Sequence, residues 1–330
     1  MKKLSFRFSS LGLSLMLCLA VAISGCSATK TTDNNQPTKT VGKTVKIGVL
    51  PIEDNLPFYV AEQDGLYAKE GVRVELVSFA SALERDTALQ AGKIDGEVAD
   101  LVAVALLKKI GTDVKIASIG LGATPKEGRF AILSSPKSNI RDMAGLKGAT
   151  LGISQNSIID YVSDQMLLDK GITLNDVKKM SIPKMPVRVD MLLSDQINAA
   201  CLPDPLASLA QAKGAHLIID DTYRNISQTV FLFRTQSIQE NPEGIKAAVR
   251  VYGLAGQALS NKPDQYRKLF LEKAQVPAEL NASYQTPTFS KLQLPTEQEI
   301  NSVMQWMVEK KLIPQAYSYQ ELVDSSLRGE

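Results

Sequence analysis

The sequence predicts an α/β protein with two lobes, each built on a doubly wound sheet. Three observations lead to this fold class. Short apolar runs alternate with helical segments from residue 45 onward, the alternation restarts after Gly128, and the chain beyond Thr235 is helical only. A tail without strands must pack on a sheet formed earlier. We therefore expect residues 45–127 and 236–330 to form lobe 1 and residues 128–235 to form lobe 2.

The first block reads as four strands that alternate with three helices. The strands are expected over residues 45–50, 72–77, 94–98 and 114–121, and the helices over residues 57–64, 81–91 and 101–110. Pro57 suits a first helical turn, Gly65 a helix stop, and Ser81 with Glu84 a capping box. This order predicts a parallel, doubly wound sheet.

The second block repeats the pattern, and the tail adds helices. Its strands are expected over residues 130–134, 150–154, 177–182, 199–202, 216–219 and 229–233. Its helices are expected over residues 140–146, 157–170, 187–193 and 204–213, followed in the tail by 243–259, 264–273 and 297–311. The chain would then cross between the lobes twice, near Gly128 and near Thr235.

The first 44 residues have the pattern of an export signal and a tether. A basic start at residues 1–7 precedes an apolar run at residues 11–23, as in a secretory signal peptide over residues 1–25. The segment Ile23–Cys26 resembles a bacterial lipobox, which would place lipid on Cys26. The alternative is an ordinary signal whose cysteine is incidental. Residues 26–44 are polar and suit a flexible tether. We expect an extracytoplasmic protein anchored to the bacterial cell membrane.

Composition excludes several function classes. A formal net charge of +2 gives no reason to expect a nucleic-acid partner. The single histidine, His216, and the scattered Cys18, Cys26 and Cys201 argue against a metal site and a disulfide framework. No GxSxG, phosphate-binding loop or GxGxxG motif is present. We therefore expect no cofactor and no catalysis, and a monomer.

Polar and aromatic residues gather where the predicted strands end, which is where open α/β sheets bind ligands. The candidate ligand-binding residues are Glu53, Asp54, Asn55, Tyr59, Phe79, Ser81, Glu97, Asp100, Asn156, Ser157, Tyr161 and Asp204. Their many carboxylates favour a neutral or cationic solute that carries hydrogen-bond donors. The alternative is that these acids cap helices and face water, since acids stabilise first turns. Phe58 and Trp306 are expected in the core.

Several segments together resemble the nitrate/sulfonate/taurine-type substrate-binding proteins of ABC importers, a group that includes binders of thiamin precursors. The segments are residues 57–71, 89–95, 142–148, 195–200 with 203–205, and 241–243. The chain departs from the family pattern in carrying Asp204-Pro205 where a Glu-Pro pair is usual, and in the acidic pair Glu53-Asp54.

The resemblance implies a type II periplasmic-binding-protein fold with a ligand cleft between the lobes. It implies a lipoprotein that captures a small organic solute and delivers it to an ABC permease in the membrane. Two alternatives remain open. One is a cytoplasmic-type enzyme of the same fold, from a menaquinone or pyrimidine pathway, and the other is a solute-sensing lipoprotein.

Overall fold

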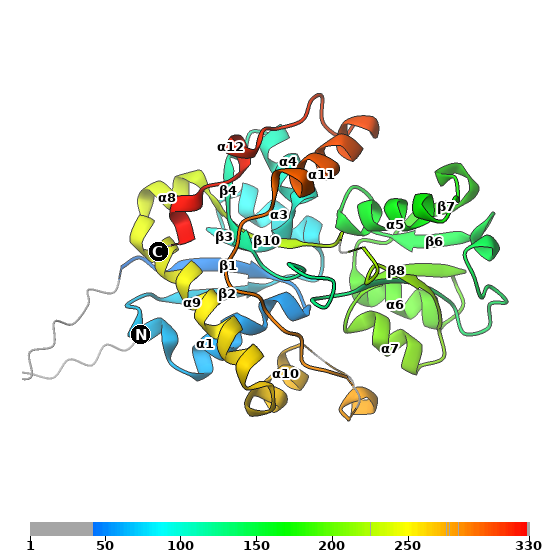
Figure 1. Ribbon diagram of the computed structural model, residues 1–330, viewed down its shortest axis with the longest axis horizontal. Coiled ribbons are helices and arrows are strands. Elements are labelled where there is room, and N and C mark those ends of the chain that lie inside the picture. The colour runs from blue at the N-terminus through cyan, green and yellow to red at the C-terminus, as the bar shows by residue number, and fades with distance from the viewer. Residues whose placement is uncertain (1–41, 225, 275, 277, 283, 329–330) are drawn as a thin grey trace, which may run out of the picture. The chain divides into compact units, whose positions relative to one another are not determined.

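The computed structural model describes residues 42–330 other than 225, 275, 277, 283 and 329–330. The predicted signal peptide, Cys26 and most of the predicted tether lie outside these residues. No helix in the described part of the chain is long and apolar enough to cross a membrane. The predicted α/β class with two lobes is confirmed, since two five-stranded sheets are each flanked by helices (Figure 1). Both sheets are mixed, however, and not parallel throughout.

The first sheet has the strand order β2-β1-β3-β10-β4. Its strands are β1 (Val45–Val49), β2 (Val74–Ser78), β3 (Gly96–Asp100), β4 (Val114–Ile119) and β10 (Thr229–Arg234). The prediction that residues 229–233 belong to the second lobe is wrong, because β10 lies antiparallel between β3 and β4. The second crossing therefore precedes Thr229 instead of lying near Thr235. Local periodicity shows that a strand exists but not which sheet it joins.

The second sheet has the order β7-β6-β8-β5-β9. Its strands are β5 (Phe130–Ser134), β6 (Thr150–Ile153), β7 (Lys178–Ser181), β8 (Ala199–Pro203) and β9 (His216–Asp220). Here β5, the strand that follows the first crossing, is antiparallel to both of its neighbours. Each sheet therefore has an antiparallel strand in its fourth position, and that strand directly follows a crossing between the lobes.

Nine helices of the described residues begin and end within a few residues of the expected positions. They are α1 (Leu56–Gln63), α3 (Ala82–Gln90), α4 (Leu101–Lys109), α5 (Ile158–Asp169), α6 (Met185–Leu193), α7 (Leu206–Ala212), α9 (Pro242–Asn261), α10 (Arg267–Lys273) and α11 (Glu297–Glu309). Three short helices were not expected, namely α2 (Leu66–Lys69), α8 (Thr235–Glu240) and α12 (Tyr319–Leu322). The agreement follows from capping: the Ser81 side chain accepts a hydrogen bond from Glu84 N, and Gly65 has a φ of 65° after α1. Residues 140–146 form only a 3-10 turn, Ala144–Leu146.

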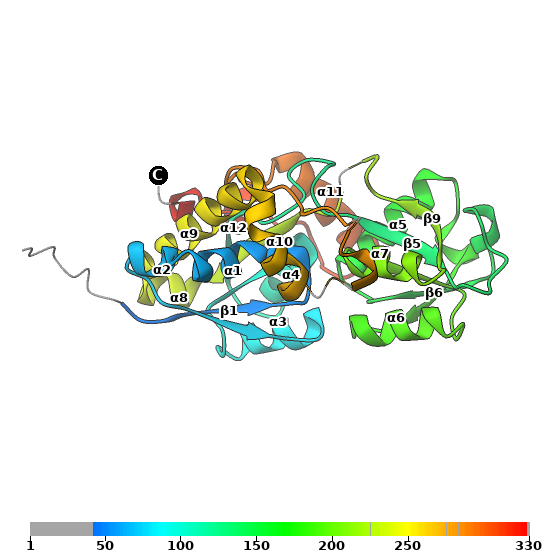
Figure 2. The same ribbon diagram turned by 90° about the horizontal axis from the view of Figure 1, so that it is seen from below.

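Helices cover both faces of the first sheet, with α1 and α9 on one face and α3 on the other (Figure 2). Phe58 of α1 is fully buried, as expected. Its ring centroid lies 5.3 Å from that of Phe231 on β10 and 4.9 Å from that of Tyr252 on α9. Aromatic contacts of this kind add to the free energy gained by burying apolar surface. The long tail helix α9 thus completes the core of the first lobe.

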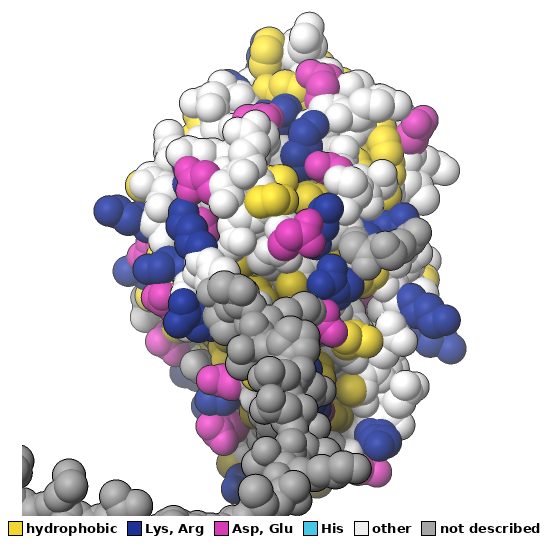
Figure 3. All heavy atoms as spheres, turned by 90° about the vertical axis from the view of Figure 1, so that its left-hand side faces the viewer, with side chains coloured by type: hydrophobic (Ala, Val, Ile, Leu, Met, Phe, Trp, Pro, Cys, Tyr) yellow, Lys and Arg dark blue, Asp and Glu magenta, His cyan; other side chains and the backbone are white. Residues whose placement is uncertain are grey.

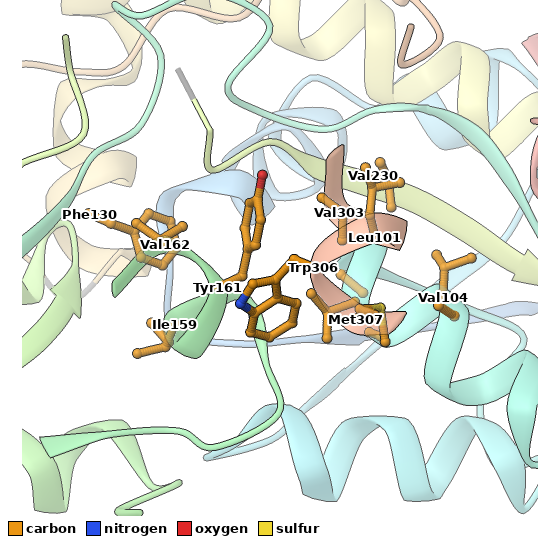
Figure 4. Packing of buried hydrophobic residues seen from close by; sticks show 14 of the residues in the cluster. Leu101, Val104, Phe130, Ile159, Tyr161, Val162, Val230, Val303, Trp306 and Met307 are labelled. Carbon is orange, nitrogen blue, oxygen red and sulfur yellow. The ribbon is translucent and has the colours of Figure 1, made fainter. Parts of the chain in front are cut away.

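Helix α11 does not belong to the first lobe alone. It packs on α4, and its Trp306 meets Tyr161 of α5 in the second lobe with ring centroids 5.3 Å apart (Figure 4). Trp306 is buried, as expected. Its Nε1 donates to an Asp164 oxygen at 2.9 Å, and Lys310 Nζ lies 2.8 Å from the same carboxylate. The tail helix α11 thus packs on the first lobe, as expected of the tail, and contacts the second lobe as well.

The surface shown in Figure 3 carries basic and acidic side chains interspersed, without a large area of one sign. Neighbouring side chains of opposite charge form ion pairs in the first lobe. Arg250 Nη2 lies 3.3 Å from a Glu70 oxygen, and Lys246 Nζ lies 3.5 Å from a Glu243 oxygen. This mixture agrees with the small net charge of the chain.

Candidate functional site

A cleft lies between the two lobes, and segments of both sheets form its walls. The first lobe contributes the turn after β1, the start of α3, and the end of β3. The second lobe contributes the start of β5, the first turns of α5 and α6, and the end of β8. The cleft encloses about 750 Å³, including the part open to solvent. Carboxyl ends of parallel strands and N-termini of helices therefore meet at one place, as open α/β sheets require.

Glu53 and Asp54 lie on the 3-10 turn Glu53–Asn55, directly after β1, and line the cleft. Asp54 accepts a hydrogen bond from the Thr229 hydroxyl, and Glu53 accepts one from the Tyr284 hydroxyl. Burial raises the pKa of both carboxyls, and the charge of Asp204 raises that of Glu53 further, to well above its ordinary value. The turn thus carries less negative charge than its sequence suggests.

Asp100 ends β3, lines the cleft and caps α4. Its Oδ1 accepts hydrogen bonds from Val102 N at 2.9 Å and Ala103 N at 3.0 Å. Burial raises the pKa of Asp100 to about 6, although these two hydrogen bonds oppose the shift. Asp100 therefore caps a helix, as the alternative interpretation of the acids stated, and it also lines the cleft.

Asp204 lies directly after β8, and its carboxylate contacts both the helix α7 and the cation Arg129. Its Oδ1 accepts hydrogen bonds from the backbone N and the hydroxyl of Ser208, both at 2.9 Å, and its Oδ2 lies 3.5 Å from Arg129 Nη1. Burial raises the pKa of Asp204, and the Arg129 guanidinium opposes that shift. Both Asp204 and Arg129 line the cleft, so this acid comes with its own counter-charge.

Glu97 lies in the first lobe with no exposed surface and does not line the cleft. Its Oε2 is 3.3 Å from Arg85 Nε. Arg85 is also buried and reaches Asp86 at 2.7 Å and the Val98 carbonyl at 2.6 Å. Burial raises the pKa of Glu97 well above its ordinary value, and Arg85 opposes the shift. The expectation that Glu97 faces a ligand is wrong, because β3 turns this side chain toward a cation.

Of the twelve residues expected at the site, the cleft is lined by Glu53, Asp54, Asp100, Ser157 and Asp204. Three further polar residues lie close by in the chain but face elsewhere. Asn55 donates to the Leu50 carbonyl at 2.6 Å, Ser81 caps α3, and Asn156 is an exposed residue with a φ of 57°. Only some of the residues that follow the strand ends therefore line the cleft.

The three aromatic residues expected at the site do not line the cleft either. Tyr59 lies on α1 with Lys273 Nζ 5.4 Å from its ring, Tyr161 packs on Trp306, and Phe79 packs against the apolar core. Each expectation rested on distance along the chain from a strand end. The direction of a side chain depends instead on its turn or helix phase.

Arg188 is one of several lining residues, with Arg129 among them, that were not among the expected site residues. It is the fourth residue of α6 and has no exposed surface. Its Nη1 donates to the Ile182 carbonyl at 2.8 Å, whereas its Nε and Nη2 have no hydrogen-bond partner among the described residues. Burial lowers the pKa of Arg188 to about 10. A signal existed: with Met185, Val189 and Leu192, Arg188 completes an i, i+3, i+4, i+7 stripe that is buried.

The described residues give little support for metal binding or for a nucleophilic thiol. No group of three histidine, cysteine, aspartate or glutamate side chains there is placed to hold a metal ion. Cys201 is buried, and burial raises the pKa of its thiol to about 11, which disfavours the nucleophilic thiolate. The arrangement suits binding, because the cleft has mostly apolar walls and a few placed polar groups.

Comparisons with known proteins agree with this geometry. A protein of Bacillus subtilis (strain 168) whose name describes an aliphatic sulfonates-binding protein is 24% identical over 74% of this chain and 72% of its own length. A Brachyspira hyodysenteriae protein named as an ABC transporter periplasmic binding protein is 26% identical, over 56% of each chain. The chain thus spans little more than half of that second relative.

A solved structure shares the fold. The alkanesulfonate-binding protein SsuA from Xanthomonas axonopodis pv. citri, bound to MOPS, superimposes with a TM-score of 0.73 at 18% identity, over 85% of this chain and 98% of its own. The model of the NMT1-like family matches residues 39–270, which is most of the chain and includes both sheets and the cleft-lining residues from Leu50 to Thr229. The chain belongs to the NMT1-like family.

Proposed function

We propose that this protein is the solute-binding component of an ABC importer, which captures a small organic solute in the cleft and delivers it to a membrane permease. The observation that carries the proposal is that both lobes line a single cleft. A solute bound there would contact the turn after β1 and the first turns of α5 and α6 together. Binding would therefore stabilise the closed arrangement over an open one.

Closure requires movement between the lobes. Two segments connect the sheets, one between Ile119 and Phe130 and one between Asp220 and Thr229. At the rim, Lys184 Nζ lies 3.2 Å from a Glu84 oxygen across the cleft, with both side chains substantially exposed. An exposed pair of this kind contributes little free energy, so opening it costs little. Hinge bending at the two connections would admit and release the solute.

Location follows from the first 26 residues, which lie outside the described residues. The signal pattern and the lipobox at Cys26 support an extracytoplasmic protein held at the membrane by lipid. Names of the relatives agree, since one describes a periplasmic binding protein of an ABC transporter. We infer a binding role and not catalysis, because the buried thiol of Cys201 and the capped or paired acids of the cleft offer no activated nucleophile.

The test uses the mature protein and a strain that lacks its gene. Thermal-shift screening with cationic, neutral and anionic solutes should identify a ligand, and calorimetry should give its affinity. Ala82→Trp places a bulky side chain at the cleft wall, so it should abolish binding and uptake. Leu83→Trp is the matched control, because Leu83 is the next residue of α3 and is 66% exposed. Failure of every solute to bind, with normal uptake in the deletion strain, would refute the proposal.

A further inference from the structure

One apolar core runs through both lobes on the side of α11. It contains Leu101 of α4 in the first lobe, Val162 of α5 in the second lobe, and Trp306 of α11 between them (Figure 4). The indole of Trp306 meets the ring of Tyr161 edge to face, with an interplanar angle of 73°. Around α6 and α7 the second lobe has a separate core, whose described members all belong to that lobe. The lobes therefore share buried apolar surface at α11, which favours their contact there.

Ion pairs add to this shared core. Asp160 and Asp164 of α5 are buried, and Lys179 of β7 pairs with both from within the second lobe. Lys310 reaches the same two carboxylates from the end of α11, with Nζ 3.3 Å from Asp160 Oδ1 and 2.8 Å from Asp164 Oδ2. If α11 moved away from α5, the two buried carboxylates would lose this lysine, and the indole N–H would lose Asp164. Loss of a partner by a buried charge is costly, so the contact resists separation.

The tail also contacts both segments that connect the lobes. The Ser290 hydroxyl donates a hydrogen bond to Glu127 in the first connecting segment. In the second connecting segment, Gln228 Nε2 donates to Glu299 Oε1 at 3.0 Å, and Glu299 lies in the first turn of α11. Residues 290–310 therefore contact the two covalent connections and α5 in succession.

The opposite edge of the molecule is held more weakly. In Figure 2, α3 and α6 lie along one edge and α11 lies along the other. Lys184 and Glu84 pair across the cleft between α3 and α6, with side chains that are 57% and 41% exposed. Water and salt screen an exposed pair of this kind, so it opposes opening only slightly. Movement that separates the lobes should therefore open the α3–α6 rim before it breaks the α11 contact.

We propose that α11 is the pivot of lobe movement, and that its contact with α5 stays intact while the rim between α3 and α6 opens. The pivot is a third, non-covalent connection beside the two connecting segments. It restricts the movement to rotations that keep α11 on α5, and so limits how far the cleft opens. The inference goes beyond the proposed function, because it concerns how the lobes move and its test requires no solute.

The test opens the rim by a change of charge. Lys184→Glu replaces the pair across the cleft by two neighbouring negative charges, which should push α3 and α6 apart. Spin labels on Leu83→Cys and Val187→Cys, two exposed positions of α3 and α6, measure the separation by double electron–electron resonance. The chain from Ser27 onward is used, because its one native cysteine, Cys201, is buried.

Trp306 reports the pivot in the same samples, because it is the sole tryptophan of the chain. In Lys184→Glu the label distance should lengthen, while the emission maximum and the acrylamide quenching of Trp306 stay as in the parent protein. Quenching should remain several-fold below that of the urea-unfolded chain, since Trp306 is buried. Lys93→Glu is the matched control, because it makes the same charge change at an exposed position beyond the other end of α3 and should change neither signal.

A second pair of variants loosens the pivot itself. Lys310→Ala and Lys179→Ala each remove one lysine from the same two carboxylates, but only Lys310 comes from α11. Both should lower the melting temperature by about 2–6 °C. Only Lys310→Ala should broaden the distribution of label distances and raise the quenching of Trp306, because Lys179 lies within one lobe.

Three results would overturn the proposal. Exposure of Trp306 in Lys184→Glu would show that opening breaks the α11 contact, which would then be a latch of the closed form. An unchanged label distance in that variant would show that the lobes do not turn about α11. Identical distance distributions in Lys310→Ala and Lys179→Ala would show that α11 does not limit the movement. None of these results bears on solute binding, which the solute screen tests separately.

Discussion

Arg85 and Arg188 hold equivalent positions in the two lobes, and among the described residues only Arg85 has a carboxylate partner. Each is the fourth residue of the helix that follows the edge strand of its sheet. The Cγ atom of Arg85 lies 2.9 Å from where a Cβ on Gly48 would be, and that of Arg188 lies 3.5 Å from the same position on Gly152. The strand residue registered with Gly48 is Glu97, whereas the residue registered with Gly152 is Ala200.

This relationship predicts different stabilities for two matched variants. Arg85→Met leaves Glu97 buried without its cation and should lower the free energy of unfolding by about 3–5 kcal/mol. Arg188→Met removes a buried charge that has no carboxylate partner among the described residues. The variant loses the hydrogen bond to the Ile182 carbonyl, but it no longer has the free-energy cost of keeping a charge away from water, so the two effects offset each other. We expect a change within about 1 kcal/mol. Urea unfolding of the ligand-free proteins measures both, and equal losses would contradict the asymmetry between the lobes.

Asp100 should make stability depend on pH. Its folded-state pKa of about 6 exceeds its ordinary value of 3.8, so the folded protein binds this proton more tightly than the unfolded chain. The contribution of Asp100 to stability therefore falls as pH rises from about 4 to about 6. Asp100→Asn keeps an oxygen to cap α4 and removes the charge. We expect it to stabilise the protein by about 1–2 kcal/mol at pH 7.5 and by much less near pH 4.

Thermal melting at both pH values measures this effect without ligand. Asp100→Ala is the control, since it removes the charge and also the cap that accepts hydrogen bonds from Val102 and Ala103. Loss of an N-cap costs about 0.5–2 kcal/mol, which should cancel the gain. If Asp100→Asn stabilised the protein equally at pH 4 and pH 7.5, removal of the buried negative charge would not be the cause of the stabilisation.

Asp164 should be essential for the contact between α5 and α11. It has no exposed surface, accepts a hydrogen bond from Trp306 Nε1 and pairs with Lys310 and Lys179. Asp164→Ala leaves two lysines and an indole N–H without this partner and should cost about 3 kcal/mol. Because Trp306 is the sole tryptophan, its fluorescence reports the contact directly and should shift to the red.

Asp190→Ala is the matched control for Asp164→Ala. Asp190 is an exposed residue of α6 in the same lobe, so the same substitution there should change stability by less than about 0.5 kcal/mol. Unchanged fluorescence and stability in Asp164→Ala would mean that α11 is held to the second lobe by apolar packing alone.

Lipid attachment predicts the location of the protein in cells. Wild-type protein should fractionate with membranes, and Cys26→Ser should be released or remain unprocessed, because the lipidated residue is lost. Cys201→Ser should stay with the membranes, since this cysteine lies buried in β8. Fractionation with immunoblotting measures all three. The same soluble, processed form for wild type and Cys26→Ser would show that residues 23–26 are an ordinary cleavage site.

The sequence alone determined the strands of the described residues, most of their helices and the class of fold. Periodicity located every strand, and capping residues such as Ser81, Ser157 and Gly65 located helix ends, because these signals act over a few neighbouring residues. The strand–helix alternation that begins again after the first crossing predicted two lobes. The rule that open α/β sheets bind ligands at the carboxyl ends of their strands correctly placed Glu53 and Asp204 at one cleft.

Tertiary structure alone decided which strand joins which sheet and which charges are compensated. Pairing of β10 with β3 joins residues more than 100 positions apart, and no local pattern encodes that choice. Glu97 and Asp100 are both acids of β3, yet one meets Arg85 and the other lines the cleft. Arg188 has no carboxylate partner in the described part of the chain, where Ala200 occupies the position that Glu97 has in the other lobe. The physical reason is that burial and counter-charge are properties of neighbours in space, which long-range pairing brings together.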